Sequence, residues 1–184
     1  MKTIQKLTAV AVAAFFFTSV SAQEKTVQVG GAPMYPSKNI VENAVNSKDH
    51  TTLVAAVKAA DLVETLASAG PFTVFAPTNA AFDKLPKGTV ETLVKPENKA
   101  TLTTILTYHV VAGKIDSKQL AEMIKAGKGK ASLKTVSGGT LIATMKGDKI
   151  MLTDENGGMA TITIANVYQS NGVIHVTDAV SLPK

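Results

Sequence analysis

The chain has 184 residues, of which 45% are hydrophobic and 18% charged, a balance typical of one globular domain and not of a disordered segment. It contains no cysteine, which excludes a disulfide framework, a thiol nucleophile and a thiolate metal site. All 19 basic residues are lysines, so the guanidinium groups that read guanine or clamp phosphate are missing, and we do not expect nucleic acid as a partner.

The first 22 residues have the pattern of a signal peptide. Met1–Lys6 is a short cationic start, Leu7–Phe17 is an almost uninterrupted apolar run, and Val20–Ala22 supplies the small residues that signal peptidase accepts. The run is too short to cross about 30 Å of hydrocarbon. We therefore expect cleavage before Gln23 and export to the periplasm or the medium, with no transmembrane anchor. Cleavage would leave 17 lysines against 14 acidic residues.

We interpret residues 23–38 as a flexible lead-in without a core of its own, because two glycines and two prolines interrupt it. Residues 39–184 are expected to form one domain. Its first part has helical patterns, and Asp49 and Asp61 are placed to cap the second and third helices. The expected helices cover 39–45, 51–60, 62–67, a segment capped by Thr78 and ended by Pro86, a segment opened by Pro96, and 117–125.

One histidine is placed on the apolar side of a predicted helix. Leu102, Ile105, Leu106 and His109 follow the i, i+3, i+4, i+7 spacing of a single helical face. This pattern puts His109 at or just beyond the end of the helix that Pro96 opens.

The last third of the chain changes to alternating or β-branched runs joined by Gly, Asn and Asp turns. An earlier strand over Phe72–Phe75 must join the sheet that these runs form. Helices followed by strands predict an α+β fold and not an alternating βαβ fold. The expected late strands are 133–136, 140–144, 150–153, 160–167 and 172–177.

Residues that could carry catalysis are sparse. The three histidines, His50, His109 and His175, lie far apart in the sequence and no pair has the local spacing of metal ligands. We interpret His50 as a residue at the start of a helix and His175 as a structural residue of the last strand. We expect no enzymatic activity, no catalytic residue, no metal and no cofactor.

Three segments in fixed order carry a resemblance. They are Gly70–Phe82, Leu106–Val111 and Asn171–Asp178. Together they resemble the fasciclin domain family, whose two signature boxes flank a central Tyr-His pair, and the match runs from about Asn39 to Pro183. The resemblance implies a β-sandwich with the helices of the N-terminal half packed against it. It also implies an extracellular or cell-surface module for adhesion or partner binding.

The resemblance marks a set of candidate binding residues. In animal members, integrin contacts are ascribed to the Tyr-His region and to an Asp-Ile pair near the last box. Here Ala165–Tyr168 precedes that box and contains no such pair, which argues against integrin binding. The candidate signature or binding residues are Tyr108, His109, Thr78, Asn79, His175 and Asp178.

We expect a monomeric, non-catalytic binding or adhesion module that contacts a protein, matrix or cell-surface polysaccharide. The alternative is a carrier of an apolar small molecule such as a carotenoid or lipid. The absence of tryptophan and the small number of aromatic residues disfavour the carrier. A hydrolase is a third reading, which would require a histidine beside a serine or carboxylate in a cleft.

The sharpest expectation concerns His109. Because His109 lies on the apolar face of the predicted helix, we expect a buried, neutral ring that is hydrogen-bonded to the Thr78–Asn79 turn or to nearby backbone. Burial without an acidic partner should lower the pKa of His109.

Overall fold

The structure is a computed structural model that describes residues 24–184, so the predicted signal peptide lies outside the described residues. The helices are α1 (Ile40–Ala44), η1 (Lys48–His50), α2 (Thr51–Ala59), α3 (Val63–Ala67), α4 (Asn79–Phe82), α5 (Thr89–Leu93), η2 (Pro96–Asn98), α6 (Lys99–Tyr108) and α7 (Ser117–Ala126). The strands are β1 (Val27–Val29), β2 (Ala32–Met34), β3 (Phe72–Pro77), β4 (Val110–Ala112), β5 (Lys130–Lys134), β6 (Thr140–Lys146), β7 (Lys149–Thr153), β8 (Met159–Gln169) and β9 (Gly172–Thr177).

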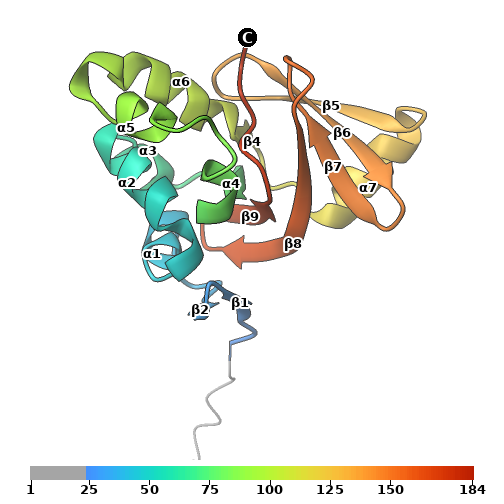
Figure 1. Cartoon of the computed structure of the whole chain (residues 1–184). Coiled ribbons are helices and arrows are strands. Elements are labelled where there is room, and N and C mark those ends of the chain that lie inside the picture. Colours follow the sequence, from blue (N-terminus) through green and yellow to red (C-terminus); the bar gives the residue numbers. More distant parts are fainter. Residues whose placement is uncertain (1–23) are drawn as a thin grey trace, which may run out of the picture.

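Seven strands form one sheet in the order β4-β3-β9-β8-β7-β6-β5. Each neighbouring pair is antiparallel except β3 and β9, which run parallel and bring the early strand against the last one. An isolated bridge between Val111 and Thr135 brings the two ends of the sheet together, so the sheet curls back on itself. Helices before a mostly antiparallel sheet confirm the predicted α+β class (Figure 1).

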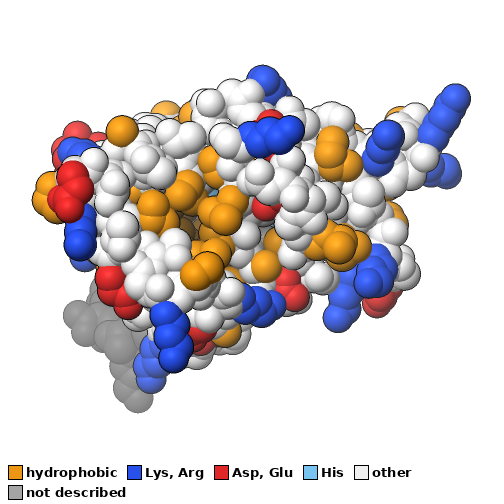
Figure 2. Space-filling model, turned by 45° about the horizontal axis from the view of Figure 1, so that its top comes forward, with side chains coloured by type: hydrophobic (Ala, Val, Ile, Leu, Met, Phe, Trp, Pro, Cys, Tyr) orange, Lys and Arg blue, Asp and Glu red, His pale blue; other side chains and the backbone are white. Residues whose placement is uncertain are grey.

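Two apolar cores lie on opposite faces of β3. Val74 and Ala76 pack into a helical core with side chains from α1, α2, α3 and α6. Phe75 points to the opposite face, into a second core with side chains from α7 and from strands β4–β8. Figure 1 shows the first six α-helices gathered on one side of the molecule and α7 behind the β5–β7 part of the sheet. Figure 2 shows hydrophobic side chains lining a hollow toward the left and lysines projecting from the right-hand end.

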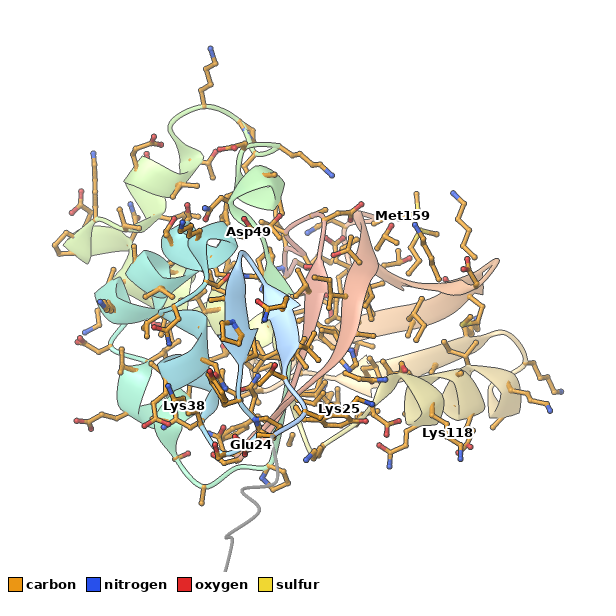
Figure 3. All side chains as sticks on the ribbon, turned by 90° about the horizontal axis from the view of Figure 1, so that it is seen from below. Glu24, Lys25, Lys38, Asp49, Lys118 and Met159 are labelled. Atoms are coloured by element: carbon orange, nitrogen blue, oxygen red, sulfur yellow. The ribbon has the colours of Figure 1, made fainter. Side chains whose placement is uncertain are left out.

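The N-terminal segment contradicts the predicted lead-in without a core. β1 and β2 form a hairpin whose turn is made by Gly30 and Gly31, both with positive φ. Its Val29 and Met34 side chains are buried in the helical core. Two glycines between short apolar runs are a hairpin signal, because glycine adopts positive φ without steric cost. Figure 3 shows this hairpin from below, with Glu24 and Lys38 near it.

Two predicted helix caps are wrong. η1 precedes α2, and the side chains of Asp49 and His50 do not cap that helix. Instead, the backbone amide of Thr52 donates to Oδ1 of Asn79 at 3.0 Å. Asp61 has a φ of 54° and lies before Leu62, the residue at the N-cap of α3. A side chain brought in by the tertiary fold therefore replaces the local cap that the sequence favoured.

Candidate functional site

His109 lies at the C-cap of α6 and is only 3% exposed. Its Nδ1 is 2.8 Å from the carbonyl oxygen of Ile105, and its Nε2 lies 3.0 Å from the backbone nitrogen of Ser181. A carbonyl oxygen can only accept, so Nδ1 carries the proton and Nε2 accepts from the Ser181 amide. The predicted burial and backbone partner are confirmed. The predicted contact with the Thr78–Asn79 turn is wrong, because the C-terminal segment occupies that place.

Burial lowers the pKa of His109, as the sequence predicted. The hydrogen bond to Ile105 and the charge of Asp154 oppose this effect without reversing it. Both ring nitrogens are satisfied only in the neutral form. A second proton on Nε2 would face the Ser181 amide, which is itself a donor, so protonation would break that bond.

Tyr108 is fully buried in the second core. Its hydroxyl donates to the carbonyl oxygen of Thr140 at 2.7 Å and accepts from the backbone amide of Glu155 at 3.2 Å. A Cβ at Gly139 would lie 2.6 Å from the ring, so the glycine makes room for it. Burial raises the pKa of the Tyr108 hydroxyl. The Tyr-His pair is therefore enclosed by the fold and is not a surface.

His175 on β9 is also fully buried and stacks on Phe75, with ring centroids 5.7 Å apart. Its Nε2 donates to the carbonyl oxygen of Ile115 at 2.9 Å, and its Nδ1 accepts from the Asn166 amide at 3.4 Å. Burial lowers the pKa of His175 against the smaller effects of Ile115 and Asp116. The structural interpretation of His175 is confirmed.

The remaining candidate residues also have internal partners. The hydroxyl of Thr78 accepts from the Ala81 amide and caps α4, as the sequence predicted. Asn79 caps α2, and Oδ1 of Asp178 accepts from the Thr161 amide at 2.7 Å. All six candidate residues thus join elements of the fold. That any of them binds a partner stays a prediction.

Asn171, a residue of the last box, holds more of the fold than its turn alone implies. Its Oδ1 accepts from the Ile40 amide at 3.0 Å, and its Nδ2 donates to the carbonyl oxygens of Leu66 and Ser68. It therefore fastens α1 and the end of α3 to the β8–β9 turn. The adjacent Gly172 has no room for a side chain, because a Cβ there would lie 2.1 Å from a backbone oxygen of β3.

His50 and Ser47 form a buried pair that the sequence did not indicate. Ser47 Oγ lies 2.9 Å from Nδ1 of His50, and both residues are nearly inaccessible to solvent. Nε2 of His50 lies near the backbone of Ala76 without a hydrogen bond of acceptable geometry. Burial lowers the pKa of His50. His50 occupies the N-cap position of α2, the helix start that the sequence predicted, although its side chain makes no capping hydrogen bond.

The pair lines an apolar cavity of about 60 Å³ between the helices and β3. Pockets for drug-sized ligands measure roughly 300–1,000 Å³, so this cavity is too small for a carotenoid or a lipid chain. A histidine beside a serine is the arrangement that a hydrolase would need, but among the described residues no carboxylate hydrogen-bonds to the His50 ring and orients it. Neither the carrier nor the hydrolase is favoured.

In residues 24–184, no three potential metal-ligating side chains converge. Within the same residues, no helix combines the length and apolar character needed to cross a bilayer.

The fold and its three signature segments define a fasciclin-type domain, and comparison with known proteins agrees. The family model described as "Fasciclin domain" matches residues 48–183. The chain belongs to the fasciclin domain family.

Two relatives and one solved structure illustrate the similarity. The chain is 48% identical to protein sll1483 of Synechocystis over 160 residues, 87% of this chain and 82% of that protein. It is 35% identical to the immunogenic protein MPB70 of Mycobacterium bovis over 145 residues, 76% of this chain and 66% of that protein. The fold matches a FAS1 domain pair from the insect cell adhesion molecule fasciclin I, with a TM-score of 0.70 at 15% identity, covering 85% of this chain and 57% of that one.

Proposed function

We propose that the chain is an exported, non-catalytic binding module that contacts a protein, matrix or polysaccharide partner at the cell envelope or outside the cell. The signal-peptide pattern supports export. The structural match to a protein described as a cell adhesion molecule supports a binding role. Fold alone does not define function.

The observation that carries the proposal is the internal use of the signature groups. Tyr108, His109 and His175 are buried, and their polar atoms bond to backbone of the same chain. Groups enclosed in this way have no route to a substrate. We therefore place partner contacts on exposed surface and not on these three residues.

The test is a pull-down in which the immobilised chain from Gln23 onward captures partners from an envelope extract. Mild crosslinking joins any bound partner to the chain. A lysine-rich protein of similar charge serves as the control for non-specific retention. We expect a partner above this control. We also expect a Tyr108→Phe variant that remains folded to retain it, because the removed hydroxyl is buried. Capture of no partner, matrix or cell surface above the control would overturn the proposal.

A further inference from the structure

β4 and β5 are the two ends of the seven-stranded sheet and close it only in part. They meet at the Val111–Thr135 bridge, where the Val136 amide donates to the carbonyl oxygen of Val110 at 2.8 Å. Beside this junction, residues of β4, β5 and α7 line an open groove of about 350 Å³, which we call the edge groove. Its apolar lining residues are Val111, Ala112, Ile115, Met123, Leu133 and Val136.

The outer edge of β5 offers backbone groups to this groove. The Thr135 amide donates to Gly139 on the β6 side, and the Val136 amide donates to β4 on the other. Because antiparallel strands alternate their hydrogen-bonding direction, Lys130, Ser132 and Lys134 turn their backbone groups away from β6. Those of Lys134 face Ala112 of β4 beside the Val111–Thr135 bridge, whereas those of Lys130 and Ser132 have no strand beside them among the described residues. Among the described residues, β5 has a strand partner along its length only in β6. Such an edge is a template for another strand.

The groove also exposes apolar side chains that a docked strand would cover. Met123 of α7 is 38% exposed and Val136 is 49% exposed, and both line the groove. Strand addition typically combines backbone hydrogen bonds with pockets for alternate side chains of the incoming peptide. The edge groove provides both.

Charge identifies the kind of strand that fits. Residues 113–134 contain six lysines and two acidic residues, whereas the rest of the described chain contains eleven lysines and twelve acidic residues. Neither salt bridge of the described chain involves a lysine of this segment. Figure 2 shows lysines projecting from the end of the molecule where Figure 1 places α7 and β5, and Figure 3 shows Lys118 on α7. The groove therefore lies in the basic part of the protein.

We propose that the edge groove binds an extended acidic segment of a partner protein, which adds as a strand to the free edge of β5. This inference rests on the proposed binding function and specifies its partner class. A second copy of this chain is a poorer occupant. Antiparallel pairing of two β5 strands about Ser132 would place Lys130 of each copy opposite Lys134 of the other, and like charges in facing positions are destabilising.

The probe is a short fluorescent peptide in which Val alternates with Glu, compared with one in which Val alternates with Lys. Fluorescence anisotropy at low salt measures affinity, and amide chemical shifts of the isotope-labelled chain from Gln23 locate the site. We expect the Glu peptide to bind at least about tenfold more tightly, since complementary charge steers and orders such contacts. The amides that move should be those of Lys130 and Ser132, the outward-facing positions of β5 that β4 leaves free.

The decisive variant is Ser132→Pro, which removes an outward backbone donor and leaves the β6 side intact. Proline is tolerated at sheet edges where the lost N–H faces solvent. We expect it to weaken peptide binding at least about tenfold, while the matched control Ser132→Ala binds normally. Lys134→Glu should also weaken binding, and Lys149→Glu on β7 should not. Circular dichroism checks that each variant is folded.

Binding that survives in Ser132→Pro, chemical shifts that map elsewhere, or equal affinity for both peptides would overturn the inference. A dimer that Ser132→Pro dissolves would assign the groove to a second copy and would overturn it as well. The two proposals fail separately. If the chain captures an envelope partner but binds no peptide, the binding function is supported and the groove proposal is wrong. If the peptide binds at Ser132 but no envelope partner is captured, the groove proposal is supported and the envelope partner is not.

Discussion

Nε2 of His109 accepts a hydrogen bond from the backbone amide of Ser181, 72 residues further along the chain, at 3.0 Å. Through its other nitrogen the same ring donates to Ile105 within α6. One neutral side chain thus fastens the C-terminal segment to the end of a helix. A histidine whose nitrogens are both used in this way serves the fold, which is why we place partner binding elsewhere.

Replacing His109 by alanine should lower the free energy of unfolding by about 1–3 kcal/mol, because the buried Ser181 amide and Ile105 carbonyl lose their partner. Urea unfolding measures the change, and hydrogen exchange should show faster exchange of the Ser181 amide. Thr101→Ala, at an exposed position of α6, is the matched control and should change little. An unaltered urea midpoint in His109→Ala would contradict the bridging role.

Stability should fall as the pH falls below about 6.5. Burial lowers the folded-state pKa of His50, His109 and His175, whereas the unfolded chain binds protons with the ordinary value of about 6.5. The unfolded state therefore takes up more protons, so the stabilisation is present above that pH and is lost progressively below it. Urea unfolding from pH 8 to 5 measures the slope.

Each histidine should contribute to that slope. His109→Ala should flatten the pH dependence as well as lower stability at neutral pH. A free energy of unfolding that is constant from pH 8 to 5, or that rises on acidification, would show that these rings are not held neutral.

Tyr108→Phe should cost about 1–3 kcal/mol, because it leaves the Thr140 carbonyl and the Glu155 amide without their buried partner. Tyr168→Phe is the matched control, since that ring is 38% exposed and its hydroxyl lies 3.4 Å from Asp116. Thermal unfolding compares the two. Equal melting temperatures would mean that the Tyr108 hydroxyl contributes nothing to the fold.

Met34→Ala should destabilise the chain by about 2–5 kcal/mol, because Met34 is a buried member of the helical core. Gln28→Ala, on the exposed side of the same hairpin, should have little effect. Denaturant unfolding measures both. A neutral Met34→Ala would restore the view of this segment as a lead-in without a core.

The sequence predicted elements whose pattern is local. The alternating runs became β5 to β9, and the i, i+3, i+4, i+7 spacing placed His109 at the end of α6. It failed where a distant segment decides. Asn79 replaces the expected cap of α2 from 27 residues away, and Ser181 takes the place expected for the Thr78–Asn79 turn. The β1–β2 hairpin was missed because its buried side chains need a core that other elements build.

Nitrogen NMR of the His109 imidazole tests whether the buried residues Tyr108, His109 and His175 hold the fold and do not form the binding surface. A neutral ring with its proton on Nδ1, which stays neutral as the pH falls through 6.5 until the protein unfolds, is the predicted result. A ring that titrates near its ordinary pKa of about 6.5 while the fold persists would contradict a buried, structural role for His109. It would return Tyr108 and His109 to the surface as candidate partner contacts.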